Sequence, residues 1–314
     1  RLAEAGEMQS AGPYVARSLA GAGRGLERVP AMQEDGQEWL PTGDVFRRLP
    51  GGHLSIVDRV KDIYKNDHGQ TIAPNHVERK FHSVPGIRRT FLVGDHRSFN
   101  VLLIVPDPDD PVLRQAPDDE SRSEYFHQIV AAANGDLAPY ERVVNFAVLE
   151  RDFELERDEL TPKGSLRRKI IERNFAPVID ALYRRPWVEI PRDGLVLRVP
   201  RWFFRDLGIL EDDIQAAGTG LYDRRRHLTL PLGRSPGDPA GPLVRIGDLD
   251  YRVAGDVVDL GTLARQPRLW MGNPSFIQFA PCKEGWDVST GAVSPVPLLP
   301  KGASREPHDI GARP

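Results

Sequence analysis

Short apolar runs separated by polar turns make up the first half of the chain. Residues 53–57 alternate around apolar positions, which is typical of half-buried strands, and residues 63–65 predict another short strand. Residues 87–93, 100–105 and 143–149 are richer in apolar side chains and predict further strands. The pattern therefore predicts a sheet-forming region over this part of the chain.

Three segments between and after these runs have helical spacing. Residues 75–81 follow Pro74, a residue that suits the first turn of a helix. Residues 124–134 place their apolar side chains on one face, and residues 170–183 repeat this amphipathic pattern. The acidic, proline-rich residues 107–123 predict an exposed loop before the second helix.

The pattern changes after residue 185, where Pro and Gly interrupt short apolar runs. A helix is predicted over residues 201–210, and residues after Gly291 have the composition of a disordered tail. Cys282 is the single cysteine. A Cys282–His308 nucleophile is conceivable, but a plain thiol is the favoured interpretation. The predicted strands are residues 195–199, 227–232, 243–246 and 250–258.

Composition limits the function classes. The 314 residues suffice for about two domains. The net charge of −3 predicts no general affinity for nucleic acid or membranes. No run approaches the roughly 18 apolar residues of a membrane span. One cysteine and no visible signal peptide fit a cytoplasmic protein, and Arg1 suggests a chain that begins partway through a longer product.

A distinctive series of motifs runs from Leu40 to Glu78. It contains Thr42-Gly43-Asp44 as a predicted turn, then Pro50-Gly51-Gly52 between two apolar runs. The charged segment Asp58-Arg59-Val60-Lys61-Asp62 follows, and Gly69-Gln70-Thr71-Ile72-Ala73-Pro74 leads into the first helix. This order resembles the adenylate-forming family, which includes acyl-CoA synthetases, peptide-synthetase adenylation domains and luciferases.

The resemblance implies roles for two nucleotide-binding side chains. The Asp44 carboxylate can accept hydrogen bonds from vicinal hydroxyls, and the matching family residue binds the ribose of ATP and of the acyl-adenylate. Arg59 carries a permanent charge on a planar fork that suits nucleotide oxygens. A plain turn at Asp44 and a surface ion pair of Arg59 with Asp58 or Asp62 are the alternatives.

Two further positions match the family's moving parts. Lys61 falls where the family has its hinge, at which a small backbone change swings the C-terminal subdomain between two catalytic poses. Gly69 falls in the loop that borders the coenzyme A tunnel. The resemblance thus implies a subdomain that serves two successive steps.

The segment ELTPKGSLRRKII, residues 159–171, matches the region that carries the adenylation lysine. A positive charge directed at developing negative charge is an effective catalytic device. Without a gap, the family's lysine position falls on Ser165. Lys163 is the nearest lysine and is taken as the catalytic candidate, with Lys169 as a weaker one.

The fold expected from these features is α+β: a small adenylate-forming C-terminal subdomain, with a mixed sheet flanked by helices, between two β-rich pieces. The predicted segments are residues 1–57, the end of a large AMP-binding domain; 58–185, the mobile subdomain; 186–290, a β-rich extension; and 291–314, a disordered tail.

The resemblance implies the C-terminal part of an AMP-forming acyl-CoA synthetase. This is an acid–thiol ligase that activates a carboxylic acid, and a fatty acid is the expected substrate. ATP, Mg²⁺ and coenzyme A are the implied cofactors, no nucleic acid is expected, and peripheral membrane contact is left open. The phosphate loop is missing, so the isolated chain is expected to be inactive. The alternatives are a non-catalytic binding or interaction protein and an adenylation domain acting on a carrier protein.

Overall fold

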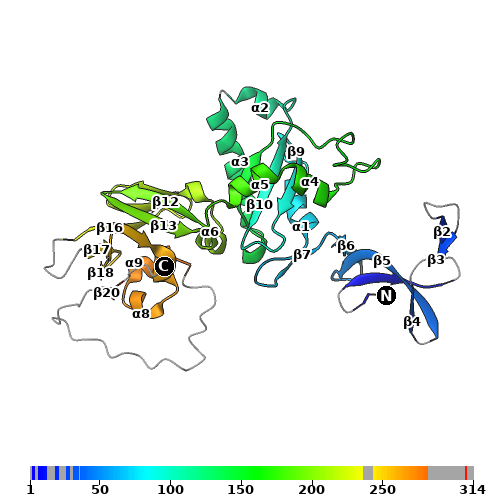
Figure 1. The fold of residues 1–314 in the computed structure, drawn as a ribbon, viewed down its shortest axis with the longest axis horizontal. Coiled ribbons are helices and arrows are strands. Elements are labelled where there is room, and N and C mark those ends of the chain that lie inside the picture. Colours follow the sequence, from blue (N-terminus) through cyan, green and yellow to red (C-terminus); the bar gives the residue numbers. More distant parts are fainter. Residues whose placement is uncertain are drawn as a thin grey trace. The chain divides into compact units, whose positions relative to one another are not determined.

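The computed structural model describes residues 2–3, 6–12, 18–20, 26–28, 31–34, 36–116, 118–235, 243–281 and 308–309. The chain divides into two compact units. Unit 1 comprises residues 1–98, 102–115 and 148–175, and unit 2 comprises residues 99–101, 116–147 and 176–314. Strands and helices occur in both units (Figure 1), so the predicted α+β class is confirmed.

An antiparallel sheet forms the first part of unit 1. Its long central strand, β5 (Gln37–Arg48), pairs with β1 (Glu7–Ser10), β4 (Met32–Glu34) and β6 (Leu54–Arg59). The predicted Pro50-Gly51-Gly52 connection is confirmed, since it joins β5 to β6. A separate two-stranded ribbon contains β2 (Ser18–Ala20) and β3 (Leu26–Arg28).

The prediction of a turn at Thr42-Gly43-Asp44 is wrong, because all three residues lie inside β5. The strand bends where Gly43 adopts φ +76°, a value that glycine tolerates without a steric penalty. The pairing with β6 also shifts register between Val45 and Phe46. The local signal for a turn therefore produces an irregular strand in which the flanking pairing continues.

The rest of the first half builds around apolar strands. β7 (Tyr64–Lys65) pairs with β8 (Thr71–Ile72), and α1 (Pro74–Glu78) continues into η1 (Arg79–Phe81). The predicted strand 87–93 coincides with β9 (Ile87–Val93), and β10 (Asn100–Pro106) extends the prediction by one residue. β11 (Val143–Val148) completes a sheet in the order β11-β10-β9.

Two helical predictions need correction. Residues 107–123 are not a continuous loop, because α2 (Pro111–Gln115) lies within them and α3 (Asp119–Asn134) begins early. The Asp118 carboxylate caps α3 by accepting a hydrogen bond from Ser121 N at 2.7 Å.

The single helix predicted over residues 170–183 is also wrong. It is two helices, α4 (Arg168–Asn174) and α5 (Ala176–Tyr183). Phe175, between them, has φ −103° and ψ 14°. Pro177 follows, and proline fits the first turn of a helix better than its interior.

The C-terminal part of unit 2 contains two sheets. In the first, β13 (Leu195–Pro200) pairs antiparallel with β12 (Trp187–Arg192) and parallel with β19 (Val257–Asp259). The second sheet has the order β14-β15-β16-β17-β18-β20. Its strands are β14 (Ile214–Ala217), β15 (Gly220–Asp223), β16 (Leu228–Arg234), β17 (Leu243–Ile246), β18 (Leu249–Arg252) and β20 (His308–Asp309).

Short helices accompany these sheets. They are η2 (Pro139–Glu141), α6 (Arg201–Leu207), η3 (Glu211–Asp213), α7 (Leu260–Ala264), α8 (Pro267–Trp270) and α9 (Pro274–Phe279). The predicted helix 201–210 ends three residues early, because Gly208 adopts φ +73° and terminates α6. The predicted strand 250–258 is two strands, β18 and β19, in different sheets.

Apolar side chains form the interior of this region. Leu195, Leu197 and Val199 alternate into the core from β13, and Phe203 and Phe204 of α6 are fully buried. A hydrophobic core of this kind supplies most of the stabilisation of the sheets. Cys282 lies outside the described residues, as does the predicted tail 291–314 apart from β20.

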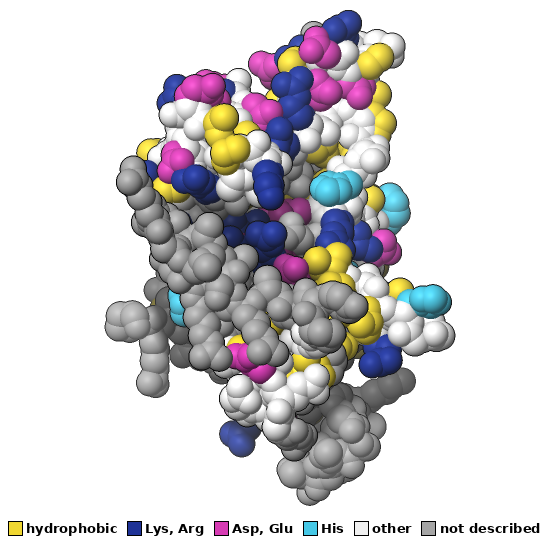
Figure 2. Space-filling model, turned by 90° about the vertical axis from the view of Figure 1, so that its right-hand side faces the viewer, with side chains coloured by type: hydrophobic (Ala, Val, Ile, Leu, Met, Phe, Trp, Pro, Cys, Tyr) yellow, Lys and Arg dark blue, Asp and Glu magenta, His cyan; other side chains and the backbone are white. Residues whose placement is uncertain are grey.

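Charged side chains of both signs share the surface. On the face shown in Figure 2, Lys and Arg side chains lie among Asp and Glu side chains. This agrees with the small net charge of the chain. Within the described residues, no helix is long and apolar enough to cross a membrane.

Candidate functional site

Unit 1 contains an open cavity of about 1400 Å³. Its walls come from the end of β6 and the turn after it, from α1 and η1, from the start of β9, and from residues 161–170. Nine of the lining side chains are Lys or Arg and three are Asp or Glu. Because the whole chain carries a net charge of −3, this excess of basic side chains is local and favours an anionic ligand.

Lys163 lies at the tip of a tight hairpin on the cavity wall. The base of the hairpin is an antiparallel bridge between Leu160 and Leu166. Thr161 N donates to Ser165 O at 2.9 Å, and Gly164 N donates to Thr161 O at 2.8 Å. Gly164 has φ +78°, which closes the turn. The hairpin presents the exposed Lys163 side chain at the cavity.

The foot of this hairpin is fixed by a buried carboxylate, Glu159. Arg151 donates to both carboxylate oxygens at 2.7 Å, and Asn174 Nδ2 and Glu154 N each donate at 2.9 Å. Burial alone would raise the pKa of Glu159, but the donors outweigh it and lower that pKa to about 2. Glu159 is therefore a charged anchor for residues 150–174.

A second buried pair holds the other end of the hairpin segment. Arg168, the first residue of α4, donates to Glu78 Oε1 at 2.9 Å and to Leu92 O at 2.6 Å. Leu92 N donates to the same carboxylate at 2.7 Å, and the Arg168 guanidinium lies 4.3 Å from the centre of the Phe91 ring. This bidentate, stacked geometry suits arginine and not lysine.

Asp58 holds the segment that contains Arg59 and Lys61. Its buried carboxylate accepts hydrogen bonds from Asn75 N at 2.8 Å and from Asn75 Nδ2 at 2.5 Å. Val60 N also donates to Gly43 O at 2.8 Å. The turn is thus tied both to the start of α1 and to β5.

Three of the five predicted site residues meet at the cavity: Arg59, Lys61 and Lys163. Asp44 is adjacent, since it faces Arg59 across the β5–β6 pairing and its Oδ1 lies 3.5 Å from Arg59 Nε. Gly69 does not line the cavity and lies on an exposed turn with φ +77°. The ion pair expected for Arg59 in the surface interpretation is made with Asp44 instead of Asp58 or Asp62.

The cavity's cations differ in how they are paired. Arg88 pairs with Asp107, Arg89 with Asp152, and Arg167 with Asp158. Within the described parts of the chain, Lys61 and Lys163 have no ion-pair partner. The same holds for Arg79 and Lys169 on this wall, so Lys61 and Lys163 are two of the four cations there with charge to offer an incoming anion.

The alternative lysine positions lie close by. Ser165 and Lys169 line the same cavity as Lys163. Ser165 N donates to Thr161 Oγ1 at 3.0 Å, so its backbone is part of the hairpin. Lys169 lies within α4 and its charge acts on Glu172.

Sequence reasoning missed four residues that shape this cavity: Asp58, Glu78, Glu159 and Arg168. Each is a charged residue with a buried polar contact, and no local pattern distinguishes it from a surface charge. The one usable signal was their position within the recognised motifs. Among the residues with described coordinates, no group of three or more His, Cys, Asp or Glu side chains could hold a metal ion, so Mg²⁺ is assigned no ligand.

Comparison with known proteins finds similarity to part of this chain. Residues 62–186 match the family described as the AMP-binding enzyme C-terminal domain. A long-chain-fatty-acid–CoA ligase of Mycobacterium tuberculosis, FadD15, is 29% identical over 199 residues, which cover 59% of this chain and 32% of the ligase. Long-chain-fatty-acid–CoA ligase 5 of Mus musculus is 31% identical over 168 residues, 48% of this chain and 24% of the ligase.

A solved structure is also similar over part of the chain. The adenylation domain of a carboxylate reductase from Mycobacterium chelonae is 27% identical, with a TM-score of 0.42, over 48% of this chain and 24% of that one. The chain spans about a third or less of the length of the curated relatives given above.

Proposed function

We propose that this chain, of which residues 62–186 match the AMP-binding enzyme C-terminal domain, serves the ATP-dependent activation of a carboxylic acid and its transfer to coenzyme A. The observation that carries the proposal is the basic cavity of unit 1, in which Arg59, Lys61 and Lys163 converge. A phosphate-bearing ligand suits such a wall because its charge is balanced there without a large change in structure.

In the proposed first step, a carboxylate oxygen attacks the α-phosphate of ATP, giving an acyl-adenylate and releasing pyrophosphate. Negative charge builds up on the phosphate oxygens during this attack, and a pre-positioned ammonium stabilises it. We assign this role to Lys163, whose hairpin is fixed through Glu159 before any ligand arrives. The anchored hairpin restricts the backbone that carries this ammonium.

The remaining site residues have supporting roles in this proposal. Asp44 would accept hydrogen bonds from the ribose hydroxyls, and Arg59 beside it would contact the nucleotide. Lys61 would be the hinge, in the turn between β6 and β7. Gly69 would border the coenzyme A tunnel, and the cavity itself offers no support for that role because Gly69 is absent from its wall.

The acid is proposed to be a fatty acid. Support comes from the relatives, which are named as long-chain-fatty-acid–CoA ligases in both a bacterium and a mouse. In the second step the coenzyme A thiol attacks the acyl-adenylate, the thioester forms, and AMP leaves. The chain length of the acid has no support in the described residues.

A binding experiment tests the proposal on the chain as it stands. AMP, ATP and coenzyme A are titrated separately into the protein by isothermal titration calorimetry. Lys163→Ala should weaken binding of ATP or AMP by about 10- to 150-fold, because a hydrogen bond to a charged group contributes roughly 1.5–3 kcal/mol. Lys65→Ala is the control, because Lys65 is exposed and lies off the cavity wall.

Two outcomes would oppose the proposal. One is that none of the three ligands binds at millimolar concentration. The other is equal binding by the wild type and by Lys163→Ala. The first result would remove the nucleotide from this cavity, and the second would remove Lys163 from nucleotide binding.

A second candidate is a binding protein without catalysis. It is favoured by Ser165, a neutral side chain at the position where the family pattern has its lysine. In that case the cavity would bind nucleotide with no contribution from Lys163, and restoring a lysine by Ser165→Lys would be needed for adenylate formation.

A further inference from the structure

Unit 2 contains a buried histidine–carboxylate contact between distant parts of the sequence. His127 of α3 and Asp213 of η3 are 86 residues apart, and His127 Nε2 lies 2.8 Å from Asp213 Oδ1. Their side chains are only 5% and 2% exposed. An ionised carboxylate can only accept hydrogen bonds, so Nε2 carries the proton of this contact.

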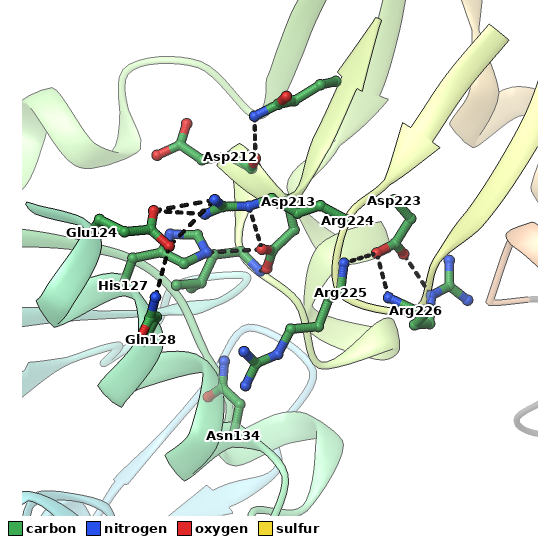
Figure 3. Close-up of polar contacts among 12 residues, drawn as sticks. Glu124, His127, Gln128, Asn134, Asp212, Asp213, Asp223, Arg224, Arg225 and Arg226 are labelled. Carbon is green, nitrogen blue, oxygen red and sulfur yellow. Dashed lines mark hydrogen bonds and ion pairs between the residues drawn. The ribbon is translucent and has the colours of Figure 1, made fainter. Parts of the chain in front are cut away.

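Arg224, in the turn between β15 and β16, extends the pair into a cluster (Figure 3). Its Nε donates to Asp213 Oδ1 at 3.1 Å, and its Nη2 donates to Glu124 Oε2 at 3.1 Å. Glu124 lies one turn before His127 on α3. We call these four residues, Glu124, His127, Asp213 and Arg224, the α3 clamp. Each side of the clamp contributes one carboxylate and one basic side chain.

The clamp is satisfied only while both sides are in place. Burial raises the pKa of Asp213, but the donors from His127 and Leu210 N outweigh it and lower that pKa overall. Removing the α3 side would take the His127 donor from the buried Asp213 carboxylate and the Glu124 partner from Arg224, and the loss of a partner costs a buried charged group more than the intact pair contributes. The two sides are therefore expected to separate only together with wider unfolding.

A second contact joins the same two parts of unit 2. Arg142, which follows η2, donates from Nη1 to the carbonyl oxygens of Arg205 at 3.1 Å and Asp206 at 2.8 Å, at the end of α6. A cation at the carbonyl end of a helix is favourable. Gly208 permits the approach, because a Cβ at that position would lie 3.2 Å from Arg142 Cζ.

We propose that helix α3 and the described residues between 187 and 281, called the extension from here on, open and close as one cooperative unit held by the α3 clamp. The segment that matches the AMP-binding C-terminal family ends at residue 186. Residue 186, the end of the matched segment, then lies inside a folding unit. The extension completes the packing of helix α3, which belongs to the matched segment. The inference does not depend on the proposed ligase chemistry.

Native-state hydrogen exchange of the full chain, resolved by mass spectrometry of peptides, tests this inference. Arg224→Gln removes the links to Glu124 and Asp213. The matched control is Arg225→Gln, which loses the same charge one residue away. The Arg225 side chain is exposed and has no hydrogen bond or ion pair within the described residues. Glu124→Gln is a milder second variant, because Glu124 is 43% exposed.

In Arg224→Gln, peptides from α3 and from β14 to β16 should exchange about tenfold faster or more, and by the same factor. Arg225→Gln should leave both unchanged, and Glu124→Gln should give a smaller but equally shared increase. The inference is overturned if the extension exchanges faster while α3 keeps its protection, or if Arg225→Gln has the effect of Arg224→Gln. If Arg224→Gln does not fold, the same comparison is made on Glu124→Gln.

Discussion

The carboxylate of Glu159 should be one of the most important single charges for the stability of unit 1. Its side chain is 0% exposed and accepts four hydrogen bonds, two of them from Arg151. In Glu159→Gln the amide nitrogen would replace one accepting oxygen, and its N–H groups would face the donors that now bind that oxygen. Breaking a buried pair by removing one partner leaves the other uncompensated.

The magnitude follows from the pKa. A shift from 4.5 to about 2 corresponds to about 3 kcal/mol of differential stabilisation of the charged form. Because Glu159 is completely buried, little of this is lost to solvent screening. Arg151 is 29% exposed and can recover some hydration, so about 2–3 kcal/mol is expected for Glu159→Gln.

Hydrogen exchange of the amides of α4 measures this effect within unit 1. At pH 7, Glu159→Gln should accelerate exchange roughly 30- to 150-fold. Asp158→Asn is the matched control. Asp158 is 60% exposed, has φ +63° that asparagine also tolerates, and pairs with the 41% exposed Arg167. It should change exchange by no more than a few fold.

The pH dependence gives an independent check. The folded pKa of Glu159 lies below its unfolded value, so its contribution is complete above about pH 4.5 and is lost as the pH falls toward 2. The wild type should lose stability over this window more steeply than Glu159→Gln. Equal slopes, or an effect at pH 7 no larger than that of Asp158→Asn, would refute the reasoning.

Two further changes should lower stability. Arg168→Lys should destabilise unit 1 by about 2 kcal/mol, because a lysine cannot bind Glu78 and the Leu92 carbonyl together and also stack on the Phe91 ring. Urea unfolding measures this loss. Gly220→Ala should lower the melting temperature of unit 2, since its Cβ would lie 1.9 Å from Leu230 O, whereas Gly255→Ala meets nothing within 4 Å and should be close to neutral.

Much of the first half of the fold could be predicted, because its strands are continuous apolar runs. Residues 87–93 are a strand in both prediction and structure. The start of α3 was missed because residues 119–123 are polar, and only the cap by Asp118 allows a helix there. The turn signal at Thr42-Gly43-Asp44 was overridden by pairing on both sides of β5.

The cavity could be predicted only in part. Lys163 lies about a hundred residues after Arg59 and Lys61, and the three converge, as the order of the motifs suggested. The residues that hold them could not be found, because partners such as Arg168 and Glu78, 90 residues apart, are chosen by the packed fold. The predicted division into four segments and the predicted roles of the site residues stay predictions.

The most direct measurement of the central claim is adenylate formation by a chimera. The segment of the M. tuberculosis ligase FadD15 that this chain matches is replaced by the matching residues of this chain. Pyrophosphate exchange into ATP with a long-chain fatty acid is then measured for the chimera, for Lys163→Ala and for the control Lys65→Ala.

The account predicts exchange by the chimera and by the control, and a loss of about 10²–10³-fold in Lys163→Ala, as for removal of one oxyanion-stabilising donor. A folded chimera without exchange, or a chimera in which Lys163→Ala keeps full activity, would contradict the account.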